Sequence, residues 1–292
     1  MDTSVKKAHY ASHRRNKIIK NTAIYIFLVI ISVIWLIPFL YMLLQSFSGH
    51  YEFDSIIPST WSIHAYKFLF TSTEYQFWKW WLNTFAIACV TAVVQTLLTL
   101  MTSYALSRLR FKMRKAIMQF MLIIGMFPSF LGMVIIYYIL RLLNMESSIY
   151  SLILIYIGGS AMNYYISKGF FDTIPRSLDE AAMIDGANKN TVFFRIIMPL
   201  SKPIVVYTLL MAFTGPWGDF MTASFYAQGN PDNFNVAVGI QNIMNPGGGT
   251  LNIANIPTFC AAGVLTAIPI MVLFFCLQRY YVEGVTGGAV KG

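Results

Sequence analysis

The chain has 292 residues, of which 57% are hydrophobic and 11% charged, and its net charge is +9. Soluble domains carry roughly 25% charged residues, so this composition excludes an ordinary soluble protein and predicts one that lies in lipid. The positive charge does not indicate nucleic-acid binding, because the basic residues lie in short segments beside apolar runs. All three cysteines fall inside apolar runs, so we expect neither a disulfide framework nor a metal site.

Six apolar runs are long enough to cross a bilayer, which takes about 20 mostly apolar residues as a helix. The runs lie at residues 23–47, 82–106, 116–140, 148–167, 203–226 and 257–278. No small-residue cleavage site follows the first run, so we expect it to stay as a span and not to be removed as a secretory signal. The pattern predicts an all-α integral membrane protein with six transmembrane helices.

The basic residues predict how these spans are oriented. Eighteen of the 21 Lys and Arg lie on the side that carries both termini if six spans alternate. Because positive residues concentrate on the cytoplasmic side of membrane proteins, we expect both termini in the cytoplasm and a multi-pass location in the cell membrane. The expected parts are a basic N-terminal segment at 1–22, a transmembrane domain at 23–280 and a C-terminal tail at 281–292.

The cytoplasmic loop at 169–202 contains a short helix with signals at both ends. Ser177 and Glu180 have the spacing of a capping box, in which the serine side chain accepts from the Glu180 backbone N–H. Gly186 is placed to end the helix in a left-handed cap. We therefore expect a helix over 178–185.

A second helix is expected in the same loop. Asn190 or Thr191 can cap it, and it is expected to run to Pro199 at the membrane edge.

The loop resembles the signature loop of ABC importer permeases. The motif reads Glu180-Ala181-Ala182, then Gly186, then Ile196-x-Met198-Pro199, with Met198 where the family usually has Leu. In that family the short helix is a coupling helix that docks in a cleft of the ATPase subunit. The residues that the resemblance implies for coupling are Ser177, Glu180, Ala181, Ala182, Asp185, Gly186 and Pro199. From the local sequence alone, an ordinary capped loop helix is an equal alternative.

The chain has no phosphate loop of the form G-x-x-x-x-G-K-[ST], so we expect it not to be an enzyme and to bind no cofactor itself. ATP and Mg²⁺ are then used by a separate ATPase.

Three further segments are similar to the sugar permeases of the maltose–maltodextrin type, in particular their shorter six-span subunit. They are Trp35–Phe39, Tyr104–Arg108 and the ending Gln278–Gly292. The resemblance implies the fold of a type I ABC importer transmembrane domain. It also implies four kinds of partner: a homologous second permease, two ATPases, an extracytoplasmic sugar-binding protein and the sugar itself.

The fifth apolar run holds the main candidates for the substrate path. Pro216 and its neighbouring glycines weaken the helix there, and a broken helix is tolerated in a membrane where it lines a cavity. An acid such as Asp219 within a span is a functional candidate by default, and Trp217 beside it suits a sugar. The equal alternative is that Asp219 is hydrogen-bonded between helices and shapes the gate. Asn163 and Ser160 in the fourth run are weaker candidates.

A polar loop precedes the sixth run and is a candidate contact for the sugar-binding protein. Its residues are Asn245, Pro246, Gly247, Gly248 and Gly249. A plain flexible loop is the equal alternative.

Taken together, the residues and the resemblance predict a permease subunit of an ATP-driven importer that moves a sugar, expected to be an oligosaccharide, by alternating access. Two alternatives stay open. One is an importer permease for another solute, such as a peptide or a polyamine. The other is a secondary transporter or membrane enzyme that works alone, which would need more ionisable groups within the spans than Asp219.

Overall fold

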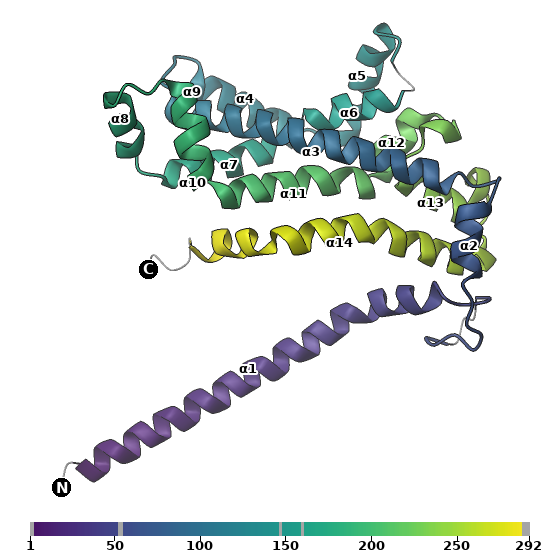
Figure 1. The fold of residues 1–292 in the computed structure, drawn as a ribbon, viewed down its shortest axis with the longest axis horizontal. Coiled ribbons are helices and arrows are strands. Elements are labelled where there is room, and N and C mark those ends of the chain that lie inside the picture. Colours follow the sequence, from purple (N-terminus) through teal and green to yellow (C-terminus); the bar gives the residue numbers. More distant parts are fainter. Residues whose placement is uncertain (1–2, 52–54, 146–147, 159–160, 288–292) are drawn as a thin grey trace. The chain divides into compact units, whose positions relative to one another are not determined.

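A computed structural model describes residues 3–51, 55–145, 148–158 and 161–287, without the side chains of 3–16, 129–130 and 281–287. In these residues the secondary structure is helical, with a single isolated β-bridge between Ser48 and Trp61 and no β-strand (Figure 1). The all-α prediction is therefore confirmed for the described part of the chain. The α-helices are α1 (Thr3–Gln45), α2 (His64–Thr71), α3 (Phe77–Arg108), α4 (Arg114–Met126), α5 (Ser129–Leu142), α6 (Ile149–Ile157), α7 (Ala161–Thr173), α8 (Ser177–Ile184), α9 (Lys189–Thr191), α10 (Met198–Leu200), α11 (Lys202–Gly218), α12 (Phe220–Ala227), α13 (Val236–Met244) and α14 (Ile256–Gly287).

Four helical segments of the described residues are long and apolar enough to cross a membrane. They are Lys17–Gln45, Phe77–Arg108, Ile149–Thr173 and Ile253–Tyr280. Two bent pairs pass the same test together, Arg114–Met126 with Leu131–Leu142, at 104°, and Lys189–Leu200 with Lys202–Gly218, at 86°. The described residues therefore hold four candidate spans, or the expected six if each bent pair is one span.

Two of the predicted spans are divided. The run at 116–140 breaks at Pro128, which has extended backbone between α4 and α5 and no N–H to continue a helix. The run at 203–226 breaks at Asp219, whose φ of −81° and ψ of 90° separate α11 from α12. Pro216 lies inside α11, so the break comes three residues after the proline.

The chain divides into two compact units, Met1–Tyr66 with Ile253–Val264 and Lys67–Asn252 with Leu265–Gly292. In the first unit, the apolar side chains of α1 are exposed all round over its membrane-length segment. A helix that is hydrophobic all round is suited to lipid or to a buried interface.

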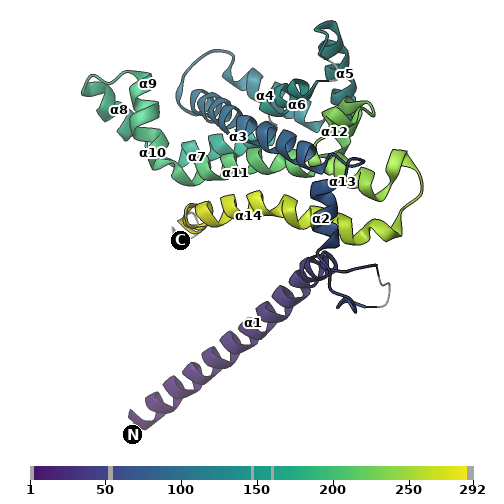
Figure 2. The same cartoon turned by 45° about the vertical axis from the view of Figure 1, so that its right-hand side comes forward.

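In the second unit, α3 lies alongside α7 and α11 (Figures 1 and 2). Trp80 is 1% exposed on α3, and its indole lies against Gly239 of α13, where an added Cβ would be 2.0 Å from the ring. The indole Nε1 also donates to the carbonyl of Pro231 at 2.9 Å. These contacts fix α13 against the start of α3.

The other end of α3 lies beside α8, α9 and α10 (Figure 1). Between α9 and α10 the chain forms a π-helix, Val192–Ile197. One apolar core joins α8 and this π-helix to α3, α7 and α11. Its buried members are Leu100, Tyr104, Phe171, Ala182, Val192, Phe193, Ile197 and Ile204. The loop helix α8 is thus built onto the end of the longest buried helix of this unit.

Candidate coupling site and substrate path

The start of α8 differs from the prediction. Ser177 is the first helical residue and makes no capping bond, because Arg176 before it already has helical backbone angles, φ −69° and ψ −21°. The Glu180 N–H donates to the Arg176 carbonyl at 3.1 Å, and the Leu178 N–H donates to the Pro175 carbonyl at 3.4 Å. The prediction of a capping box is therefore wrong, because the Glu180 N–H donates to the Arg176 carbonyl and not to the Ser177 side chain.

The end of α8 confirms the prediction for Gly186. Its φ is +85°, a conformation that glycine adopts without steric cost. The Gly186 N–H donates to the Met183 carbonyl at 3.1 Å, and the Ala187 N–H donates to the Ala182 carbonyl at 2.9 Å. These two bonds form a Schellman motif, so the glycine turns the chain sharply out of α8.

The second loop helix is capped earlier than predicted. The side chain of Asn188 accepts from the Thr191 backbone N–H at 2.8 Å and from the Thr191 hydroxyl at 2.9 Å. Helical structure then runs from Lys189 through the π-helix to Leu200, with Pro199 in its last turn. The candidate caps Asn190 and Thr191 were wrong because Asn188 reaches the free amide first.

The two alanines of the motif differ in exposure. Ala182 is 8% exposed and belongs to the apolar core of this unit, whereas Ala181 is exposed. Of the two alanines that the resemblance implies for coupling, Ala181 is therefore open to a partner and Ala182 packs inside this unit. Glu180, Asp185 and Gly186 are exposed, as their candidate role requires.

Three apolar residues that were not predicted share the exposed surface of α8. Leu178 is 40% exposed, Met183 48% and Ile184 86%. Contiguous exposed apolar surface marks contact sites for other proteins or for the membrane, so these side chains add to the candidate contact surface of α8. The sequence did contain a signal for this surface, because three large apolar residues occur within the eight residues of this loop helix.

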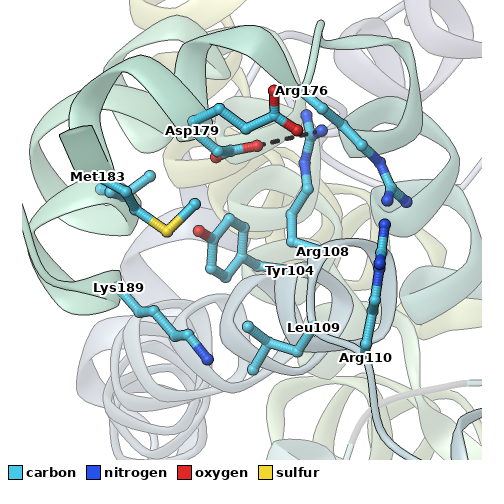
Figure 3. Close-up of a pocket in the computed structure, with 10 residues that line it drawn as sticks. Tyr104, Arg108, Leu109, Arg110, Arg176, Asp179, Met183 and Lys189 are labelled. Atoms are coloured by element: carbon cyan, nitrogen blue, oxygen red, sulfur yellow. Dashed lines mark ion pairs between the residues drawn. The ribbon is translucent and has the colours of Figure 1, made fainter.

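A cavity of about 430 Å³ separates α8 from the end of α3 (Figure 3). Its charged lining residues are Arg108, Arg110, Arg176, Asp179, Glu180 and Lys189. Arg108 Nη1 lies 3.2 Å from Asp179 Oδ2, and the two side chains are only 5% and 11% exposed. Burial raises the pKa of the Asp179 carboxyl, and the neighbouring Arg108 opposes that rise.

The break at Asp219 is held by three neighbours. Asp219 Oδ1 accepts from the Thr222 N–H at 3.0 Å, which caps α12, and Oδ2 accepts from the Tyr156 hydroxyl at 2.9 Å. Asn235 Nδ2 donates to the carbonyls of Pro216 at 3.0 Å and Asp219 at 2.9 Å. The geometry therefore favours the alternative in which Asp219 is hydrogen-bonded between helices.

The other substrate-path candidates are in different surroundings. Trp217 is 3% exposed and packs on Trp81, with ring centroids 5.6 Å apart, which favours a packing role. Asn163 lines a separate cavity of about 190 Å³. Thr91 and Gln95 on α3 line the same cavity and were missed, although their i, i+4 spacing places them on one helix face. Ser160 lies outside the described residues.

The polar loop before α14 is an ordered turn. Gly247 and Gly248 have φ values of +63° and +75°, and the Gly248 N–H donates to the Asn245 carbonyl at 3.0 Å. Pro246 and Gly249 are exposed with them. The loop therefore forms a hydrogen-bonded turn whose glycines are exposed.

These features define the class of the protein: a helical membrane component with a capped helix in the loop between its apolar segments. The chain belongs to the family of binding-protein-dependent transport system inner membrane components, whose model matches residues 95–287. It is therefore a multi-pass membrane protein of a transport system.

The chain is similar along most of its length to characterised permeases. It is 38% identical to the galactooligosaccharides transport system permease protein GanQ of Bacillus subtilis, over 92% of this chain and 94% of that protein. It is 37% identical to the maltodextrin transport system permease protein MalD of Streptococcus pneumoniae, again over 92% and 94%.

A solved structure has the same fold. It is that of a bacterial ABC transporter involved in the import of the acidic polysaccharide alginate. The TM-score is 0.77, with 19% identity and coverage of 91% of this chain and 98% of that one.

Proposed function

We propose that this chain is one permease subunit of an ATP-driven importer that takes up an oligosaccharide delivered by an extracytoplasmic binding protein. Family membership supports the dependence on a binding protein. The two similar permeases are named for galactooligosaccharides and maltodextrins, which supports an oligosaccharide over a peptide or a polyamine. A secondary transporter working alone is not supported by a family defined by its binding protein.

The observation that carries the proposal is the surface of α8. An exposed carboxylate, Glu180, stands beside the exposed Met183 and Ile184 on a helix fixed at its inner face. This surface suits a partner with a basic group next to an apolar cleft, and we assign that partner as one of two ATPase subunits. They use ATP and Mg²⁺, and this chain catalyses no reaction.

The finer architecture belongs to the same proposal. We assign six spans with both termini in the cytoplasm, a basic segment at 1–22, a transmembrane domain at 23–280 and a tail at 281–292. A homologous permease completes the pore. The excess of Lys and Arg on one side supports this orientation.

Alternating access follows from this arrangement. Closure of the ATPases on ATP moves α8, and α8 moves the helices it contacts, so that the permease pair opens outward and later inward. Asn163 and the polar side chains of Thr91 and Gln95 are the supported candidates for the sugar path, because they line one cavity between helices. The exposed turn at Asn245–Gly249 is the candidate contact for the binding protein.

Charge reversal of Glu180 tests the proposal. Glu180→Arg is expected to abolish sugar uptake and to loosen ATPase co-purification, while the chain remains inserted in the membrane. Glu74→Arg is the matched control, since Glu74 is also exposed but lies between α2 and α3, away from the coupling loop. Normal uptake and co-purification in Glu180→Arg would remove the assignment of α8.

A further inference from the structure

The end of α3 forms a binding surface for α8, here called the α3 seat and defined by Tyr104, Ser107 and Arg108. Tyr104 is 7% exposed and packs on Phe193, with ring centroids 4.9 Å apart. Ser107 Oγ donates to Asp172 Oδ1 at 2.6 Å. Each side chain of the seat thus contacts an element other than α3.

Arg108 makes the most connections in the seat. Its Nη2 donates to the carbonyls of Phe171 at 2.9 Å and Ile174 at 2.7 Å, which lie at the end of α7. Its Nη1 lies 3.2 Å from Asp179 on α8. One guanidinium group therefore links α3, the end of α7 and α8 (Figure 3).

The negative charge of Asp179 is compensated by its ion pair with Arg108. Neither carboxylate oxygen has a hydrogen-bond partner among the described residues, although both are buried. Arg108 lies within ion-pair distance of Asp179, and the positive charge of Arg176 also lowers the pKa of this carboxyl, by less than Arg108 does. A buried charge without compensation is strongly unfavourable, so α8 is held in the orientation that keeps Asp179 on Arg108.

Besides the ion pair, one hydrogen bond ties the start of α8 to α3, because Arg176 Nη2 at the N-cap donates to the Ser107 carbonyl at 3.3 Å. Of its eight residues, only Asp179 and Ala182 are buried. Ala182 contributes non-directional apolar packing, which allows the helix to slide or rotate. The ion pair is the directional attachment made by a side chain of α8 itself, and the Arg176 bond adds a second one at the residue before the helix.

We propose that Arg108 and Asp179 are positioning residues that make α8 move together with α3, so that a movement of the ATPases reaches the transmembrane helices. The assignment rests on the proposed function of α8 as the ATPase contact. Neither residue is needed to bind the ATPase itself, because both side chains face inward. Loss of the pair is therefore expected to uncouple ATP hydrolysis from transport and to leave the ATPase bound.

The first test measures the attachment in the full chain. A nitroxide is placed at Ile184, which is 86% exposed, after Cys89, Cys260 and Cys276 are replaced by alanine. Electron paramagnetic resonance is expected to show a more mobile label in Asp179→Asn and in Arg108→Met. The control is Arg110→Met, which removes an exposed arginine of the same cavity.

The second test uses the complete transporter with its own partner subunits. Uptake of mixed maltodextrins and galacto-oligosaccharides per ATP hydrolysed is expected to fall by roughly tenfold in Arg108→Met and Asp179→Asn, which lies within the usual range of coupling between two sites. The amount of ATPase that co-purifies is expected to stay unchanged. The double variant Arg108→Asp/Asp179→Arg is expected to recover part of both the coupling and the label immobility.

If Arg108→Met fails to accumulate, Arg108→Lys takes its place. Lysine keeps the positive charge but cannot bond both carbonyls and Asp179 as the guanidinium does, so an intermediate mobility of the label is expected. The proposal is overturned if the Arg108 and Asp179 variants match Arg110→Met in both tests. It is also overturned if they lose the ATPase. If Glu180→Arg leaves uptake and ATPase binding intact, the proposed function fails instead, which is a separate result.

Discussion

The amide of Asn235 is expected to determine whether the break between α11 and α12 is stable. This side chain is 1% exposed, its Oδ1 caps α13 by accepting from the Val238 N–H at 2.9 Å, and its Nδ2 donates to two carbonyls at the break. Asn235→Asp keeps the cap and removes both donors. The new carboxylate oxygen then faces the carbonyl oxygens of Pro216 and Asp219.

The magnitude follows from these two bonds. A buried carbonyl left without a donor costs about 1–3 kcal/mol, so two lost bonds predict about 2–6 kcal/mol of destabilisation. The lower half of this range is expected, because the bond to Asp219 is only partly buried. A loss of 2 kcal/mol lowers the melting temperature by about 4 °C or more, at about 2–4 °C per kcal/mol.

The assay is melting in detergent, followed by a dye that reacts with thiols as they become accessible. Cys89 on α3 is the reporter, with Cys260 and Cys276 replaced by alanine. Asn188→Asp is the matched control, because Asn188 also caps a helix and an aspartate keeps its acceptor oxygen. If Asn235→Asp and Asn188→Asp melt at the same temperature, the account of the break is wrong.

Two glycines give further predictions. Gly239→Ala is expected to destabilise the chain by about 1–3 kcal/mol, since its Cβ would lie 2.0 Å from the Trp80 ring. The control is Gly169→Ala in α7, whose Cβ meets no atom within 4 Å and which is expected to be neutral or stabilising. The same melting assay compares the two variants, and equal melting temperatures would contradict the packing of Gly239 on Trp80. Gly186→Val forces a side chain into a φ of +85°, at about 1–2 kcal/mol. Hydrogen exchange at residues 183–188 is expected to rise more in Gly186→Val than in Gly186→Asn, which tolerates this conformation, and no difference between them would remove the role of the left-handed cap.

Local signals in the sequence predicted those features that depend on a few neighbouring residues. Gly186 ends α8 because its position demands a left-handed backbone. The apolar runs mark the long helices because lipid requires continuous hydrophobic length. Both signals can be read without knowledge of the fold.

Features that depend on distant residues were missed. A hydrogen-bonded Asp219 was one of the alternatives, but its partners Asn235 and Tyr156, 16 and 63 positions away along the chain, were not predicted, and the sequence placed the weak point of the helix at Pro216. Ala181 and Ala182 are identical residues, and only the packing of α8 decides which of them is buried.

The role of Arg108 was hidden for the same reason. The family resemblance at Tyr104–Arg108 marked the segment, but its contacts with α7 and α8 come from residues more than 60 positions away. A basic residue at the end of a span is also explained by orientation alone. The structure distinguishes a contact inside the protein from a role in orientation alone, because the side chain of Arg108 is 5% exposed and points into the protein.

Transport by the reconstituted complex tests the central claim most directly. Proteoliposomes would contain this chain with its partner permease and the two ATPases, and the sugar-binding protein would be supplied on the outer face. Oligosaccharide uptake is expected to require ATP, the ATPases and the binding protein together, and to be absent when the chain carries Glu180→Arg. Uptake by this chain without the ATPases, or ATP-driven uptake that is unchanged by Glu180→Arg, would contradict the account.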